Sequence, residues 1–295
     1  MQLTSTNSSI GLIYALKKIT HRVDMKCPLC GSNKNTLIWN NKLRSGKNIW
    51  TKKKHKIYKC NSCSLGFLEK RDDLLEDNSI FRKLYDGSNS IKKYLSFNRP
   101  RELHKLYKIK KLLSFKNKSI LESNCGAASI LDLLKNESKF TAGLDDKIYK
   151  KHVEKKHIFF SNLKQLNQSK IKFDIILSLA EIEHKKNPIS FVRLLIKNLK
   201  KGGLIIFRIP NYQNIYKLLG GEYFLKYDFR LSHNFYFDQI SADYFFKKLK
   251  LKIVKKNGFQ EYDANHLFTF ANTLKRSTKV KKFFSKKQLN LIEKI

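Results

Sequence analysis

The chain has 295 residues, 41% of them hydrophobic, which is enough for one α/β core plus a small accessory module and excludes disorder throughout. No apolar stretch reaches 18 residues, and the N-terminus lacks a basic start followed by a long apolar segment, so we expect a soluble, cytoplasmic protein without a transmembrane segment. The formal net charge is +37, from 61 Lys and Arg against 24 Asp and Glu.

This charge has two interpretations. Clustered cations gain affinity for nucleic acid by releasing counterions from phosphates. However, the cations are 51 Lys and only 10 Arg, and Arg is the better reader of phosphates and base edges. An AT-rich coding bias produces the same Lys, Asn and Ile excess with no partner. A nucleic-acid or acidic-membrane partner is therefore possible but not favoured.

The chain divides into five predicted regions. Residues 1–24 are a lead-in, 25–70 a cysteine-rich module, 71–115 a helical linker, 116–274 an α/β domain and 275–295 a basic tail. Pro100 is a predicted helix start in the linker, and this helix could cover a ligand of the α/β domain.

Four of the five cysteines form two CxxC pairs, Cys27 with Cys30 and Cys60 with Cys63. Each pair can present two thiolates to one ion, and four thiolates make a closed tetrahedral zinc site with a structural role. Two disulfides and redox-active dithiols are the alternatives. Disulfides are disfavoured in an intracellular chain. Redox-active dithiols are disfavoured because a redox reaction needs only one CxxC pair, and this chain has two matched pairs.

From Ser119 onward, strand and helix patterns alternate, which predicts a mainly parallel, doubly wound sheet. Asn187 is a predicted N-cap, Pro188 occupies the first helical position, and Gly202-Gly203 is expected to end that helix. The predicted strands are 120–121, 140–144, 157–160, 173–179, 204–209, 251–255 and 267–271, and the further predicted helices are 127–134 and 239–249, the latter capped by Asp238.

The segment from Phe173 to Asn211 reads Phe-Asp, apolar run, Glu-His, Asn-Pro, helix, Gly-Gly, apolar run, Pro-Asn. In this pattern it resembles the region around motifs IV and V of class I methyltransferases that use S-adenosylmethionine (SAM). The resemblance covers about residues 25 to 272. It implies a Rossmann-like doubly wound methyltransferase sheet with a small N-terminal zinc-ribbon module, similar to sugar and glycan-pathway methyltransferases. The two last predicted strands correspond to the closing antiparallel pair of that fold.

The resemblance also implies a cofactor site. The family's first motif corresponds to the stretch from Ser119, in which Glu122 and Gly126 match, whereas Asn124 and Ala128 stand where the family usually has glycine. Asp145 matches the acidic residue that holds the ribose hydroxyls, with Asp146 beside it as a helix N-cap. Further on, Asn162 takes the place of an aspartate near the adenine. Cys125, inside the turn, is interpreted as a packing residue.

Two histidines are candidate bases for removing a proton from the acceptor. His184 follows a strand at its carboxyl end, where open α/β sheets bind ligands, although Glu183 and His184 could instead orient the loop. His233 resembles the histidine of the His-aromatic segment in sugar methyltransferases, but Ser232 replaces the acidic residue usual in C-methyltransferases. Candidate substrate-binding residues, each also readable as packing or loop structure, are Glu183, Asn211, Tyr212 and Tyr236.

The resulting hypothesis is SAM-dependent methyl transfer to a small polar acceptor, most plausibly a nucleotide-linked sugar or surface-glycan precursor, with structural Zn²⁺. The alternatives are an RNA methyltransferase, favoured by the charge, and a non-catalytic binding protein of the same fold, favoured by Asn124 and Ala128. The sequence identifies neither the acceptor nor the oligomeric state.

Overall fold

The computed structural model describes residues 25–46, 49–69, 91–258, 264–273, 281–285 and 288. The predicted lead-in, the first part of the predicted linker and most of the predicted basic tail lie outside these ranges.

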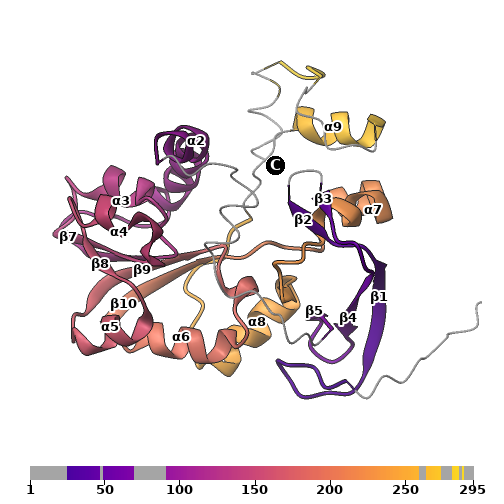
Figure 1. The fold of residues 1–295 in the computed structure, drawn as a ribbon, viewed down its shortest axis with the longest axis horizontal. Coiled ribbons are helices and arrows are strands. Elements are labelled where there is room, and N and C mark those ends of the chain that lie inside the picture. The colour runs from indigo at the N-terminus through magenta and orange to yellow at the C-terminus, as the bar shows by residue number, and fades with distance from the viewer. Residues whose placement is uncertain are drawn as a thin grey trace, which may run out of the picture.

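A five-stranded parallel sheet forms the centre of the larger part of the molecule (Figure 1). Its strand order is β10-β9-β6-β7-β8, so the chain winds outward in both directions from β6 and β9. This order confirms the predicted doubly wound methyltransferase-type sheet. The strands are β6 (Ser119–Ser123), β7 (Phe140–Leu144), β8 (Ile158–Phe160), β9 (Phe173–Leu179) and β10 (Leu199–Arg208).

Helices cover both faces of this sheet (Figure 1). Neighbouring strand residues point to opposite faces, so Ile175 packs against α2, α3 and α4 while Ile176 packs against α5 and α6. Both residues are almost fully buried, as expected for a central parallel strand. These helices are α2 (Ile91–Lys110), α3 (Ser129–Leu134), α4 (Lys150–Val153), α5 (Leu163–Gln168) and α6 (Pro188–Ile196).

The predicted helix start at Pro100 is wrong, because Pro100 lies inside α2. Proline removes one main-chain hydrogen bond and leaves the carbonyl of Ser96 without its helical donor. Pro100 and Ser96 are both exposed, so water can reach that carbonyl. Leu106 and Ile109 are buried against α3 and the sheet, so this face of α2 packs on the α/β domain.

The start of α6 is as predicted, because Asn187 caps the helix by accepting from the Ser190 N–H at 3.0 Å. Its predicted end is wrong. The helix stops at Ile196 because the carbonyl of Asn198 accepts from the Phe173 N–H at 2.8 Å, which turns the chain into β10. Gly202, with φ of 75°, lies within β10, where the register shifts between Leu199 and Leu204.

The N-terminal module is a second, four-stranded sheet with the order β1-β4-β5-β11. Strand β11 (Phe235–Tyr236) comes from the far end of the chain and pairs antiparallel with β5. A short hairpin, β2 with β3, lies beside this sheet. The other strands are β1 (Asn35–Asn41), β2 (Arg44–Gly46), β3 (Ile49–Trp50), β4 (His55–Cys60) and β5 (Gly66–Leu68).

The predicted closing strand pair is wrong. Residues 251–258 form no strand, and all of them except Leu251 are exposed. Residues 267–271 belong to α9 (Ala264–Thr273), because Phe270 packs on Tyr216 and Phe224 of α7 (Ile215–Asp228). The preceding helix, α8 (Gln239–Lys248), has the predicted Asp238 cap.

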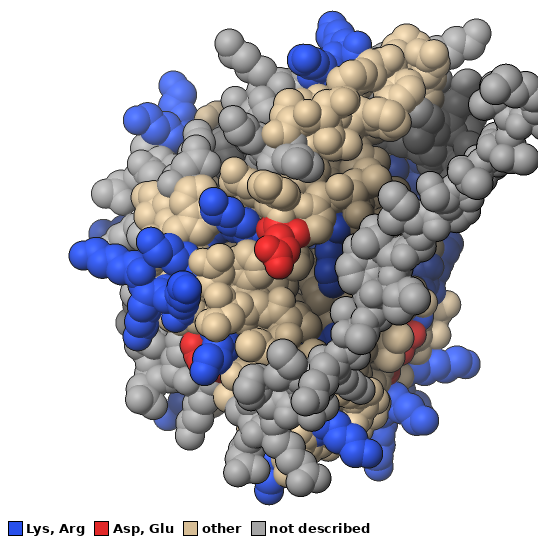
Figure 2. Space-filling model, turned by 90° about the vertical axis from the view of Figure 1, so that its right-hand side faces the viewer, with Lys and Arg blue, Asp and Glu red and all other residues tan. Residues whose placement is uncertain are grey.

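Lys and Arg are scattered over the face that carries the N-terminal module (Figure 2). Uncharged surface separates them, and the few visible Asp and Glu lie among them. On this face the described cations therefore do not form the continuous stripe that tracks a nucleic-acid backbone.

Candidate functional site

The four predicted ligand thiols meet at one point of the N-terminal module. Their sulfur atoms lie within 4.8 Å of one another, with Sγ–Sγ distances of 3.6 Å for Cys27 with Cys63 and 3.5 Å for Cys30 with Cys60. A tetrahedral zinc ion with Zn–S bonds of about 2.3 Å needs sulfur separations of about 3.8 Å. The cluster therefore fits a zinc ion, and the other described cysteine, Cys125, lies elsewhere in the fold.

This module is joined to the α/β domain at the second cysteine pair. The Ser64 hydroxyl donates to the Asp238 carboxylate, which caps α8, and the Ser64 carbonyl accepts from the Tyr212 hydroxyl at 3.3 Å. Leu68 donates its N–H to the carbonyl of Asn234 at 3.0 Å, next to β11. The segment that contains His233 is thus tied to the cysteine module.

The turn after β6 has the backbone shape of a glycine-rich motif despite its side chains. Asn124, Gly126 and Ala128 all have left-handed φ values, of 62°, 56° and 61°. These are the three positions where the resembling family has glycine. Gly126 is also sterically required, since a Cβ there would collide with the Tyr94 hydroxyl of α2. Two non-glycine residues are therefore held in a conformation that costs about 1–2 kcal/mol for an ordinary side chain.

This strain predicts unequal effects of the same substitution on stability at two adjacent positions. Ala128→Gly relieves the left-handed strain but loses a buried methyl and adds unfolded-state entropy, so we expect a change in unfolding free energy within about 0.5 kcal/mol of zero. Ala127→Gly, one residue earlier and equally buried, relieves nothing and should cost about 1–2 kcal/mol. Guanidinium unfolding of both variants measures the difference; equal losses would contradict the strained turn.

Asp145 lies at the end of β7 and is bonded to this turn. One carboxylate oxygen accepts from the Gly126 N–H at 2.6 Å and the other from the Asp146 N–H at 2.7 Å. The Asp146 carboxylate accepts from the Ile148 N–H at 3.0 Å and begins the short helix Lys147–Tyr149, as its predicted cap role requires. Asp145 is 6% exposed and therefore both supports the turn and faces the cavity beside it.

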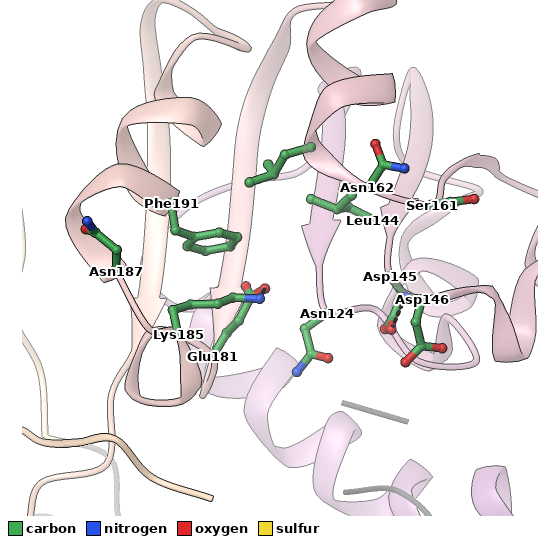
Figure 3. A pocket seen from close by; sticks show the side chains of 11 residues that line it. Asn124, Leu144, Asp145, Asp146, Ser161, Asn162, Glu181, Lys185, Asn187 and Phe191 are labelled. Atoms are coloured by element: carbon green, nitrogen blue, oxygen red, sulfur yellow. Dashed lines mark hydrogen bonds and ion pairs between the residues drawn. The ribbon is translucent and has the colours of Figure 1, made fainter. Parts of the chain in front are cut away.

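That cavity has a volume of about 350 Å³ and opens at the carboxyl edge of the parallel sheet (Figure 3). This size lies within the range of small-molecule sites. Asn124, Asp145, Asp146 and Asn162 line one side of it, and residues from the end of β9 and from α6 line the other. The Asn162 side chain also caps α5 by accepting from Gln165 at 2.9 Å. The structure thus brings together three of the five predicted cofactor residues; Glu122 and Gly126 lie behind them in the strand and turn.

Four lining residues on the β9 and α6 side were not predicted as site residues: Glu181, Lys185, Asn187 and Phe191, of which Asn187 was predicted only as a helix cap. Glu181 is buried and paired with the Lys185 ammonium at 3.0 Å, and the same ammonium lies 4.3 Å from the centre of the Phe191 ring. Glu181 follows the carboxyl end of β9 just as Asp145 follows β7, and that position was a usable signal. Phe191 can be recognised as a cavity-lining residue only from the packing of α6 on the sheet.

The two candidate bases lie together, with ring centroids 4.8 Å apart. His184 Nδ1 donates to the carbonyl of Ser232 at 2.8 Å, which puts the lone pair of the neutral ring on Nε2. Glu183 Oε1 is 4.0 Å from that Nε2. Burial lowers the pKa of His184 to about 4 and lowers the pKa of His233 well below its usual value, so both rings are neutral at pH 7.

Burial also raises the pKa of Glu183 to about 7. A raised carboxyl pKa means that the native state loses stability as pH climbs from the ordinary value of 4.5 towards 7. Without added divalent ions, Glu183→Gln should therefore stabilise the chain by about 2 kcal/mol more at pH 8 than at pH 5.5. Paired denaturant unfolding of wild type and variant at the two pH values measures this; a pH-independent difference would contradict it.

The predicted substrate-binding residues occupy different environments. Asn211 is exposed and accepts from the Gln213 N–H at 2.9 Å. Tyr212 is 2% exposed, and the Tyr236 hydroxyl is bonded to the backbone of Arg230, so for these two the packing interpretation accounts for the contacts. Glu183 lies directly against the two histidines. The Tyr236 ring also lies beside His233, with ring centroids 5.7 Å apart.

In the part of the chain that the structure describes, no helix has both the length and the apolar character needed to cross a membrane.

No curated protein matches the chain. Among solved structures, it is similar to a SAM-dependent methyltransferase from Archaeoglobus fulgidus, with 19% identity, TM-score 0.46, and coverage of 68% of this chain and 90% of that one. It is also similar to a SAM-dependent methyltransferase from Clostridium acetobutylicum, with 19% identity, TM-score 0.33, and coverage of 49% of this chain and 58% of that one. A third similar structure is the N-methyltransferase NodS from Bradyrhizobium japonicum, solved in complex with S-adenosyl-L-homocysteine. Its identity is 16% and its TM-score 0.32, with coverage of 38% of this chain and 61% of that one.

The family model described as "Methyltransferase domain" matches residues 96–288, about two thirds of the chain, from α2 through the parallel sheet and beyond α9. The chain therefore belongs to the methyltransferase-domain family.

Proposed function

We propose that this protein transfers the methyl group of SAM to a small polar acceptor, and that the acceptor is a nucleotide-linked sugar or surface-glycan precursor. The observation that carries the proposal is the cavity of about 350 Å³ between the left-handed turn and the end of β9, where Asn124, Asp145 and Asn162 converge. Three left-handed positions give that turn the backbone shape of a glycine-rich motif, which disfavours the non-catalytic alternative.

In this proposal the cofactor is held by residues on both sides of the turn. The carboxylate of Asp145 takes the ribose hydroxyls, Asn162 bonds the adenine amino group, and Glu122 with the backbone of Asn124 and Gly126 forms the remaining wall. SAM supplies an electrophilic methyl group on a sulfonium. The chain itself aligns the acceptor, excludes water and removes one proton.

His184 and His233 are the proposed bases. Both rings are held neutral by burial, so each can accept a proton at pH 7. His184 directly precedes Lys185 and donates its backbone N–H to the Glu181 carbonyl at 3.0 Å. Glu181 and Lys185 line the cavity, whereas neither histidine is among its lining residues, so the proposal places the acceptor between the cavity and the histidines. Acceptor contacts are assigned to Glu183, Asn211, Tyr212 and Tyr236, and the four cysteines hold structural zinc.

RNA is the second candidate acceptor because of the net charge of +37. The low Arg content and the scattered cations of Figure 2 disfavour it. A steep fall of RNA affinity with added salt would show only that binding depends on charge. A preference for one RNA structure or sequence would support RNA as the acceptor.

The test is release of S-adenosyl-L-homocysteine from SAM in the presence of nucleotide sugars, free nucleotides, or structured RNA. We expect turnover with a nucleotide sugar, reduced at least 100-fold in His233→Gln or His184→Gln with SAM affinity unchanged. Turnover with RNA but with no nucleotide sugar would identify RNA as the acceptor in place of the sugar. Absence of turnover with every acceptor, although SAM binds, would contradict the proposal.

A further inference from the structure

A compact group of metal-ligating side chains lies outside the cysteine module. In the described residues, one ligand atom each from Glu183, His184 and His233 fall within 4.8 Å of one another. Glu183 and His233 are buried and His184 is half-buried. The three residues come from two segments that are 49 positions apart, so their convergence is a product of the fold.

Glu183 gives an independent indication of a ligand. Its side chain is 2% exposed, and among the residues that the structure describes, no other residue donates a hydrogen bond to either carboxylate oxygen. A buried carboxylate without partners is costly unless it is protonated or faces a cation. His184 Nε2 lies 4.0 Å from Glu183 Oε1, and it is the lone-pair nitrogen of a neutral ring and not a donor. The carboxylate and this lone pair therefore face the same small volume.

The surrounding hydrogen bonds hold these ligands in place from behind. His184 Nδ1 is fixed by the Ser232 carbonyl, the usual outer contact of a metal-ligating histidine. Asn234 donates its backbone N–H to the Glu183 carbonyl at 2.8 Å and its side-chain amide to the His184 carbonyl at 2.7 Å. Three bonds thus lock the Glu183-His184 turn to the segment that contains His233.

We propose that Glu183, His184 and His233 form a second metal site, which binds a divalent transition ion through two imidazoles and one carboxylate. This donor set suits zinc, iron, cobalt or nickel and leaves coordination positions open. Bond lengths of about 2.1 Å require ligand atoms about 3.3 Å apart, so small side-chain rotations close the site. Magnesium is disfavoured because it prefers oxygen ligands. The positive charges of Arg208 and Arg230, which act on Glu183, also oppose purely electrostatic binding.

The site would change how the acceptor is activated. An ion there would bind an acceptor oxygen and favour its deprotonation, so His184 and His233 would be ligands and not bases. Metal binding itself is measured without SAM and without an acceptor. Its failure would leave the proposed methyl transfer intact, with the imidazoles acting as bases.

The test is the metal content of full-length protein saturated with zinc and then with Co²⁺. Elemental analysis after removal of free ions should give two ions per wild-type chain, and Co²⁺ in the second site should show ligand-field bands without sulfur charge-transfer bands. Glu183→Gln and His233→Gln should weaken the second ion at least about 100-fold while keeping the first. His104→Gln, which removes an exposed histidine of α2, is the matched control and should keep two.

Circular dichroism and SAM titration show whether each variant is folded. One ion per wild-type chain, held by the cysteines, would overturn the proposal. So would a second ion that persists in both folded variants, or one that millimolar Mg²⁺ displaces.

Discussion

Chelating the metal of the four-cysteine cluster is expected to unfold the N-terminal sheet and to lower methyl transfer at least 100-fold, although the cysteines touch no reacting atom. Structural zinc sites contribute on the order of 10 kcal/mol, comparable to the whole stability of a domain. Strand β11 pairs with β5, and His233 lies two residues before the start of β11. Loss of zinc should therefore release the segment that carries a proposed base.

Two variants test this coupling. Cys63→Ser should lose zinc and speed amide exchange across residues 230–238, while exchange in β6 and β9 stays slow. Cys125→Ser removes the buried cysteine of the turn after β6, which is outside the zinc cluster, and this variant should keep full zinc content. If amide exchange across residues 230–238 stays slow after the metal is chelated, the metal does not position His233, and this prediction is contradicted.

Asp145→Ala is expected to weaken SAM binding at least 100-fold. Loss of two charge-assisted hydrogen bonds, each of about 1.5–3 kcal/mol, amounts to more than a hundredfold in affinity. The same change removes the acceptors of the Gly126 and Asp146 N–H groups, so the chain should also lose about 1–3 kcal/mol of stability. Calorimetry and denaturant unfolding measure the two effects separately.

Asp146→Ala is the matched control. Asp146 also lines the cavity, but its carboxylate caps the short helix at Lys147–Tyr149. We expect a change in SAM affinity of no more than a few-fold. Similar losses in both variants would mean that general negative charge, and not the position of Asp145, determines binding.

Local signals made much of the fold predictable. Asn187 with Pro188, and Asp238, fix helix starts through contacts within four residues, and the structure has both. The parallel sheet followed from the alternation of apolar strands and helices. Errors occurred where distant contacts decide: Asn198 ends α6 by bonding β9, and residues 267–271 are helical because they pack on α7.

The candidate site was predictable to the same extent. The cysteine spacing and the acidic residue after β7 are chain-local patterns, so the cluster and Asp145 could be found. The left-handed backbone at Ala128 could not, because alanine carries no signal for it. Neither could the meeting of Glu183 with His233, which depends on pairing β11 to the cysteine module.

Calorimetric titration of zinc-loaded wild-type protein with SAM tests the central claim most directly. The account predicts binding at one site per chain, abolished by Asp145→Ala and retained by Asp146→Ala. Absence of binding to folded, zinc-loaded protein would contradict a working cofactor site and would leave a methyltransferase fold with another role.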